Sequence, residues 1–178
     1  MTTAASILLT PPVTSRDHVR GSGNAAVTLV VYGGYACPQC REIRFIVNRL
    51  HSILGDQLRY AFRNFPKSIL HPNSHGAAEA AEAAGAQNKF WEMHDFLYDR
   101  QLALSDKHLK FYATQVGLDM ARFNRDMMQH TYAARVCEDI LSARKSGVGV
   151  APALFVNDSR YVGSCDFETL VSQLGKTT

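Results

Sequence analysis

The sequence contains few cysteines, a single tryptophan and no long apolar run. Four cysteines among 178 residues are too few for the disulfide framework of a small secreted domain. Charged residues are interspersed and leave a net charge of +3, so no basic run predicts a nucleic-acid-binding surface. The chain also lacks internal repeats and low-complexity tracts. This length and composition predict one globular domain over residues 15–178.

The first residues lack the pattern of a targeting or membrane-spanning segment. Residues 4–9 form a short apolar run that is broken by Ser6, has no preceding positive charge and is followed by Pro11-Pro12. Such a run is a poor signal peptide and is too short to span a bilayer. We therefore expect a loose N-terminal arm over residues 1–14 and a cytoplasmic protein. Removal of a signal sequence would instead make it an exported protein.

The segment Cys37-Pro38-Gln39-Cys40 carries the strongest functional signal. It follows a β-branched apolar run over 27–32, which predicts a strand, and it opens a helical pattern over 38–54. The first sulfur would lie at the helix N-terminus, where free N–H groups and the helix dipole favour a thiolate. The second would lie one turn further on, within reach of a mixed disulfide on the first. This arrangement predicts a dithiol that opens and closes reversibly.

Two other interpretations of the cysteine pair are weaker. A structural zinc site needs four ligands, but Cys137 and Cys165 are far apart in the sequence. His71 and His75 have helical spacing, but His71-Pro72 is typical of a turn, so the two histidines need not lie on one helix face. A purely structural disulfide would close too short a loop to remove much chain entropy. We therefore predict redox chemistry with neither a metal nor an organic cofactor, because the dithiol itself carries the electrons.

The remaining pattern predicts an α/β fold. Residues 57–63 alternate polar and apolar side chains as a strand does, and residues 73–147 are almost wholly helical in pattern. A hairpin is expected over 153–157 and 160–162, followed by a helix capped by Asp166. A right-handed crossover would make the first two strands parallel, and the hairpin would add antiparallel strands. The prediction is a mixed sheet flanked by helices, with a large helical insertion at about 73–147.

Three segments resemble the DsbA-like thioredoxin-fold oxidoreductases, particularly their cytoplasmic bacterial and antiporter-fused relatives. They are Val-Tyr-Gly-Gly-Tyr-Ala-Cys-Pro-Gln-Cys at 31–40, the alanine- and glutamate-rich segment at 77–95, and Gly-Val-Gly-Val-Ala-Pro-Ala-Leu-Phe-Val-Asn at 147–157. The resemblance covers about residues 17–175 and implies a thioredoxin-like sheet split by the helical insertion.

The resemblance also implies roles for individual residues. Cys37 would be the nucleophile and Cys40 the resolving thiol. Pro152 would be a cis-proline that faces the dithiol and, with Ala151, offers an extended edge to a substrate peptide. An ordinary trans turn proline is the alternative for Pro152. Pro38 and Gln39 would modulate the dithiol from within the motif.

Several positions depart from the family pattern. Val31 stands where relatives commonly have a buried acid that moves protons to and from the resolving cysteine, and Gly34 and Ala36 stand where they often have acids. Fewer carboxylates would favour the Cys37 thiolate. Neutral Gln39 replaces the histidine of strongly oxidising members, which predicts a less oxidising site. Ala151 lacks the hydroxyl of the threonine that many relatives have before the proline.

Other reactive residues are interpreted structurally. Cys137 falls on an apolar helical stripe and is expected to be buried as a small hydrophobe. Cys165 precedes the Asp166 helix, whose dipole would lower its pKa, but it has no resolving partner nearby and is expected to be non-catalytic. His71 could approach the dithiol after Asn64-Phe65-Pro66, but His71-Pro72 can equally be a plain turn, and we expect the turn. A stripe of large apolar residues is expected to pack the insertion onto the core: Phe90, Trp91, Met93 and Leu97.

The leading functional hypothesis is a thiol–disulfide oxidoreductase that acts on protein or peptide substrates, in the reducing direction, and is recycled by a separate reductant or oxidant. A redox-inactive or weakly active peptide-binding module is the alternative, and Val31 favours it. Glutathione-linked chemistry of distant relatives usually has serine at the position of Cys37, so the dithiol argues against it. The sequence indicates neither a nucleic-acid nor a membrane partner, and it does not determine the oligomeric state.

Overall fold

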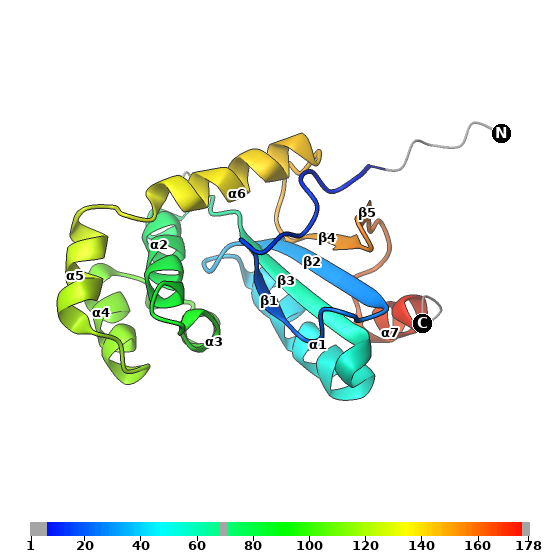
Figure 1. The fold of residues 1–178 in the computed structure, drawn as a ribbon, viewed down its shortest axis with the longest axis horizontal. Coiled ribbons are helices and arrows are strands. Elements are labelled where there is room, and N and C mark those ends of the chain that lie inside the picture. Colours follow the sequence, from blue (N-terminus) through cyan, green and yellow to red (C-terminus); the bar gives the residue numbers. More distant parts are fainter. Residues whose placement is uncertain (1–6, 68–70, 176–178) are drawn as a thin grey trace.

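The computed structural model describes residues 7–67 and 71–175 and has a mixed β-sheet at its centre (Figure 1). The strands follow the spatial order β1-β3-β2-β4-β5. Their bounds are β1 His18–Arg20, β2 Val27–Gly33, β3 Leu58–Asn64, β4 Ala153–Val156 and β5 Ser159–Arg160. β2 and β3 are parallel, and every other neighbouring pair is antiparallel. The predicted mixed thioredoxin-like sheet is therefore confirmed. The sequence analysis did not predict β1, because a strand of three residues has no recognisable pattern.

Helices cover both faces of the sheet because its central strands are apolar on both sides. Alternate residues of a strand point to opposite faces. Val27, Leu29 and Val31 of β2 pack into the cluster that includes α1 (Pro38–Leu54) and α7 (Phe167–Leu174). Val30 and Tyr32 belong to a second cluster with Ala143 of α6 (Ala133–Lys145). Burial on both faces is typical of a strand with a parallel neighbour and explains the continuous apolar run.

The helical block predicted over 73–147 is confirmed. It contains α2 Ser74–Gly85, α3 Phe90–Asp99, α4 Asp106–Gln115, α5 Met120–Met128 and α6, and Figure 1 shows α2 to α5 as a lobe beside the sheet. A one-turn 3₁₀ helix, η1 Gly55–Gln57, follows α1. Phe90, Met93 and Leu97 are buried in the same cluster as α1, so the aromatic stripe is core, as expected. Within the described ranges, no helix has the length and hydropathy needed to cross a bilayer.

The N-terminal arm is attached to the domain where the structure describes it, which corrects the expectation of a loose arm for residues 7–14. Residues 1–6 lie outside the described residues. Leu9 is buried, and its N–H donates to the carbonyl of Asp158 at 2.8 Å. The N–H of Thr10 donates to Oγ of Ser146 at 2.8 Å. A single buried leucine shortly before Pro11-Pro12 gave no periodic signal, so the sequence pattern missed this attachment.

Arg63 of β3 is the polar anchor for this segment. Its guanidinium donates to both carboxylate oxygens of Asp17, at 2.7 and 3.1 Å, and to Oη of Tyr32 at 2.9 Å. It also donates to the carbonyls of Pro11 and Pro12, each at 3.0 Å. A guanidinium has five N–H donors, and here each has an acceptor. The buried charge is thus fully hydrogen-bonded, and this ties the chain before β1 to the sheet.

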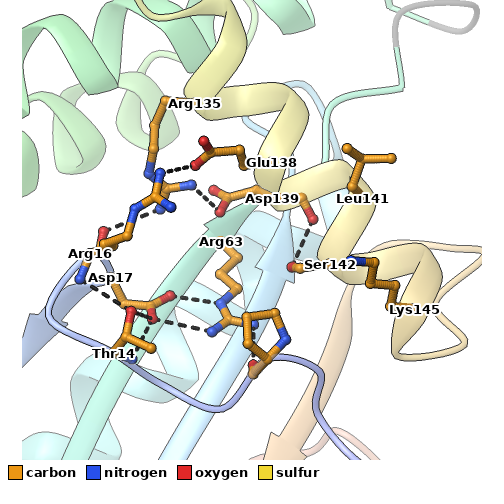
Figure 2. A pocket seen from close by; sticks show the side chains of 11 residues that line it. Thr14, Arg16, Asp17, Arg63, Arg135, Glu138, Asp139, Leu141, Ser142 and Lys145 are labelled. Carbon is orange, nitrogen blue, oxygen red and sulfur yellow. Dashed lines mark hydrogen bonds and ion pairs between the residues drawn. The ribbon is translucent and has the colours of Figure 1, made fainter.

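A charged pocket of about 280 Å³ lies above this anchor, between the N-terminal segment and α6 (Figure 2). Several of the side chains drawn there form ion pairs with one another. Arg135 bonds Asp139, and Arg16 bonds Glu138. Burial raises the pKa of Asp139 to about 6, although Arg135 opposes this shift. Each of the three arginines that line the pocket is paired with a carboxylate, so the pocket wall is built largely of ion pairs.

Candidate active site

The dithiol lies where the sequence places it, at the junction of β2 and α1. Cys37 is the N-cap residue of α1, with extended backbone angles, and Pro38 is in the first turn. Proline fits there because its missing N–H would have no intrahelical partner. The N–H of Cys40 donates to Sγ of Cys37 at 3.3 Å. The sulfur of Cys37 therefore takes the place of the usual capping oxygen and occupies the positive end of the helix.

This environment favours the thiolate of Cys37. The pKa of Cys37 is lowered to about 7, first by a hydrogen bond from the Cys40 thiol and then by backbone N–H groups and the charge of Lys67. Burial opposes the shift. The thiolate is the nucleophilic form of cysteine, so about half of this group would be reactive near neutral pH.

Cys40 is held in the opposite state. Its side chain is buried, with 2% of the residue exposed. The hydrogen bond that its thiol gives to Cys37 raises the pKa of Cys40, and burial raises it further. The pair is thus asymmetric, with an accessible thiolate on Cys37 and a shielded neutral thiol on Cys40. This asymmetry suits a nucleophile and a resolving thiol.

The segment before β4 faces the dithiol. The peptide bond between Ala151 and Pro152 is cis, which agrees with the geometry that the family resemblance implies. Sγ of Cys37 lies 3.8 Å from the carbonyl oxygen of Ala151 and 3.7 Å from Oε1 of Gln39. Ala151, Gln39 and Pro38 line one pocket together with Cys37. The structure therefore brings these expected site residues together, while Pro152 adjoins them through Ala151.

Gln101, in the turn after α3, is a site residue that the sequence did not reveal. Its side-chain amide donates to the carbonyl of Tyr35 at 2.7 Å and to that of Cys37 at 2.8 Å. One amide of the helical insertion thus holds both ends of the short loop that leads into the dithiol. A lone glutamine in a polar turn has no sequence signature for such a contact.

His71 lies beside the dithiol, so the expectation of a plain turn outside the site is wrong, and the alternative that it approaches the dithiol is correct. Together with Lys67 and Ser74, it lines the pocket of about 130 Å³ that contains Cys37. The parallel pairing explains this position, because Gly33 and Asn64 are paired at the ends of β2 and β3. Chain that leaves neighbouring parallel strands emerges at the same edge of the sheet, and this rule would have placed His71 near Cys37.

The other two cysteines lie outside the dithiol. Cys137 is exposed on α6, so the expectation that it is buried is wrong. Its neighbour Val136 faces the core instead, because the buried stripe of α6 is narrower than the apolar pattern suggested. The pKa of Cys165 is raised, mainly by burial, whereas the sequence suggested a decrease from the helix dipole. This protonated thiol agrees with a non-catalytic role.

Val31 is buried in β2 among apolar side chains, at 2% exposure. Behind the dithiol loop, Oη of Tyr35 bonds Nδ1 of His94 at 3.1 Å. Complete burial lowers the pKa of His94 well below its ordinary range, so this imidazole is neutral. The buried position of Val31 therefore offers no carboxylate, and the neighbouring buried imidazole of His94 is neutral.

A thioredoxin-type sheet with a dithiol at the β2–α1 junction and a cis-proline beside it defines the class of the protein. The chain matches the family model Thioredoxin_4, described as thioredoxin, over residues 13–176. It belongs to this thioredoxin family. Within the family, its fold is that of the DsbA-like thiol–disulfide oxidoreductases with a helical insertion.

Solved structures of this kind are similar over nearly the whole chain. BdbD from Bacillus subtilis, in its oxidised form, is 22% identical with a TM-score of 0.85, covering 99% of this chain and 98% of that one. The thiol–disulfide exchange protein alpha-DsbA2 from Wolbachia pipientis is 24% identical with a TM-score of 0.80, covering 92% and 88%. A thioredoxin-like oxidoreductase from Silicibacter pomeroyi is 26% identical with a TM-score of 0.79, covering 93% and 95%.

The curated relatives that match are much longer proteins. A Na(+)/H(+) antiporter NhaA 1 from Salinispora arenicola is 41% identical over 92% of this chain but only 25% of its own length. A Na(+)/H(+) antiporter NhaA from Herminiimonas arsenicoxydans is 39% identical over 94% of this chain and 27% of its own length. The chain thus spans about a quarter of these relatives.

Proposed function

We propose that this protein is a thiol–disulfide oxidoreductase that exchanges disulfides with protein substrates through Cys37 and Cys40, in the reducing direction. The observation that carries the proposal is the asymmetry of the pair. Cys37 is partly exposed with a pKa of about 7, whereas Cys40 is buried with a raised pKa. Two identical side chains three residues apart are thereby given different chemical states, as sequential attack and resolution require.

The first step is attack by the Cys37 thiolate on a substrate disulfide. A bond forms between Sγ of Cys37 and one substrate sulfur, while the substrate S–S bond breaks and the other sulfur leaves as a thiolate. The carbonyl of Ala151, 3.8 Å from Sγ, lies at the edge where an extended substrate segment would lie during this attack. Pro152 follows in the chain and would hold this edge in shape.

Resolution by Cys40 becomes easier once the mixed disulfide exists. The largest cause of its raised pKa is the hydrogen bond to the Cys37 thiolate, and this acceptor loses its charge when Cys37 is joined to substrate. Cys40 then releases its proton and attacks Sγ of Cys37, and the second substrate sulfur leaves as a thiolate. Two electrons pass from the dithiol to the substrate, and the protein ends with a Cys37–Cys40 disulfide.

The reducing direction and a cytoplasmic location form one part of the proposal. A reducing compartment returns the dithiol to its reduced state, through a separate thiol protein or a small thiol. Gln39 supports this direction, because a neutral side chain beside Cys37 gives the thiolate less stabilisation than a cationic histidine would. Equilibration with glutathione or dithiothreitol buffers measures the redox potential. A strongly reducing potential supports the direction, whereas a potential near those of strong oxidants contradicts it.

Turbidimetric reduction of insulin tests the activity itself. The wild-type protein should accelerate the reaction, and Cys37→Ser should abolish the acceleration because it removes the nucleophile. Cys137→Ser is the matched control, since it removes an exposed thiol on α6 that lies outside the dithiol. Equal rates for wild type and Cys37→Ser would contradict the proposal.

Val31 supports a second candidate, a peptide-binding module with little redox turnover. An apolar side chain at this buried position offers no carboxylate to accept the proton of Cys40. Such a module would bind unfolded peptide through the Ala151–Pro152 edge and would bind equally well with or without Cys37. This candidate would be favoured if the wild-type protein does not reduce insulin and if Cys37→Ser binds peptide as well as the wild type does.

A further inference from the structure

The pocket beside Cys37 carries a local excess of positive charge and hydrogen-bond donors. Its lining includes Lys67, His71 and Ser74, whose side chains can donate hydrogen bonds. Among the described residues that line it, none is acidic. The volume of about 130 Å³ would hold a small polar group, but it is too small for a whole peptide.

These donors are available to a ligand. Within the described chain, the Lys67 ammonium forms no ion pair, and the side chains of His71 and Ser74 donate to no protein acceptor. By contrast, the arginines of the charged pocket beneath α6 are bonded to carboxylates. Ser74 is nearly fully buried at the start of α2, so its hydroxyl has little access to acceptors other than those that enter this pocket.

The backbone fixes this wall close to the nucleophile. The N–H of Phe65 donates to the carbonyl of Gly33 at 2.7 Å, which extends the β2–β3 pairing past the end of both strands. A Cβ at Gly34 would lie only 3.1 Å from the carbonyl of Phe65, so glycine permits this close approach. Lys67 lines the same pocket as Cys37, and its positive charge contributes to the lowered pKa of Cys37.

We propose that this pocket binds a carboxylate located beside the disulfide that Cys37 attacks, with Lys67 and His71 as the specificity-determining residues. The inference rests on the proposed disulfide exchange and adds a substrate class to it: disulfides that are flanked by negative charge. An acidic side chain next to a polypeptide cysteine and the terminal carboxylates of a small peptide disulfide share this chemistry.

Alkylation of Cys37 by iodoacetate and by iodoacetamide tests the charge preference without any redox turnover. In both reactions the thiolate sulfur forms a bond to the CH₂ carbon and iodide leaves, but only iodoacetate carries a carboxylate. The ratio of the two rate constants cancels changes in the thiolate fraction, because both reagents need the same thiolate. Mass spectrometry of the Cys37 peptide separates this reaction from those of Cys137 and Cys165.

Removing the Lys67 charge should lower the iodoacetate-to-iodoacetamide ratio. A single positive charge near the sulfur, in largely aqueous surroundings, should raise this ratio about threefold. Added salt should reduce the effect by screening the charge. We expect about a threefold decrease for Lys67→Gln and a further decrease for Lys67→Gln combined with His71→Gln. Lys107→Gln is the matched control, because Lys107 is exposed on α4 away from the pocket. A ratio that is unchanged by Lys67→Gln, or that Lys107→Gln lowers equally, would overturn the proposal.

Two pairs of disulfides then distinguish the sources of the carboxylate. Glutathione disulfide is compared with its neutral ester, and a peptide disulfide with glutamate beside the cysteine is compared with the same peptide containing glutamine. Faster oxidation of the protein dithiol by the charged member of either pair supports the proposal and identifies that source. No preference in either pair overturns it. Absent insulin reduction with an intact alkylation preference would reject the oxidoreductase activity but retain the carboxylate site.

Discussion

The side-chain amide of Gln101 donates to the carbonyl of Cys37 at 2.8 Å, across 64 residues of sequence. The same nitrogen donates to the carbonyl of Tyr35. The dithiol loop is therefore held by the helical insertion as well as by the sheet. This contact makes the insertion part of the architecture of the site rather than an independent appendage.

Replacing Gln101 by methionine, which has a similar shape, should lower both stability and activity. Each lost hydrogen bond costs about 1 kcal/mol, so the free energy of unfolding should fall by about 2 kcal/mol. Urea denaturation measures the stability, and insulin reduction should slow because the loop before Cys37 is less restrained. Gln87→Met is the control, since Gln87 bonds the backbone of Asp119 far from the dithiol. If both variants slow insulin reduction equally, the loop restraint does not account for the effect.

The reactivity of Cys37 should follow a pKa of about 7. Iodoacetamide modification should rise with pH around that value, and ultraviolet thiolate absorbance should give the same midpoint. Cys40→Ala should move the midpoint to higher pH, because the largest cause of the lowered pKa is the hydrogen bond from Cys40. A midpoint that stays the same in Cys40→Ala would show that the backbone N–H groups and helix dipole alone are sufficient.

The same lowered pKa makes the stability of the reduced protein depend on pH. The unfolded chain has the ordinary cysteine pKa, so the folded state binds fewer protons between about pH 7 and 9. The contribution of Cys37 is complete above the unfolded pKa and is lost as the pH falls through about 7. Urea midpoints of the reduced wild type and Cys37→Ser should therefore diverge as the pH rises from 7 to 9. Parallel profiles would contradict this linkage.

Asp139 and Glu138 are adjacent acids whose removal should have very different costs. Asp139 is buried, pairs with Arg135 and accepts the backbone N–H of Asn64 at 2.8 Å. Asp139→Ala leaves these donors without an acceptor and should lower the free energy of unfolding by about 3 kcal/mol. Glu138→Gln changes only an exposed pair with Arg16 and should leave the free energy of unfolding almost unchanged. Chemical denaturation of both variants checks the difference, and similar costs would contradict the role of burial.

Replacing Arg63 by lysine should destabilise the protein although the positive charge is retained. An ammonium has three donors and cannot reproduce the planar contacts to Asp17, Pro11 and Pro12. We expect Arg63→Lys to lower the free energy of unfolding by about 2 kcal/mol and to release the N-terminal segment. Hydrogen exchange of the Leu9 amide would detect the release. Unchanged protection of that amide would mean that Leu9 burial alone holds the segment.

The sequence predicted those parts of the fold that local patterns determine. The strand before Cys37, the helix that begins at Pro38 and the Asp166 cap all lie at the predicted positions. The contacts that the sequence did not reveal connect distant residues. β1, Gln101 and the attached N-terminal segment depend on partners forty or more residues away, and short or irregular segments carry no periodic signal for such pairing.

For the candidate site too, the sequence predicted the local motif but not the residues that distant segments contribute. Cys37 and Cys40 belong to one motif, so their proximity follows from a single helical turn. Lys67 and His71 come from the chain after the neighbouring strand, and only the parallel pairing of β2 and β3 places them beside Cys37. Cys137 was misassigned because an apolar stripe alone does not determine how far around a helix the protein core extends.

The burial of Cys40 also has a kinetic consequence. With Cys40 at 2% exposure, solvent and partner proteins reach the dithiol through the sulfur of Cys37 alone. Under the proposed function, the molecule that restores the reduced pair would have to dock on the same small surface as the substrate that oxidises it. The two would then exclude each other, and turnover would proceed by strict alternation, with each partner slowing the cycle when it is in large excess over the other.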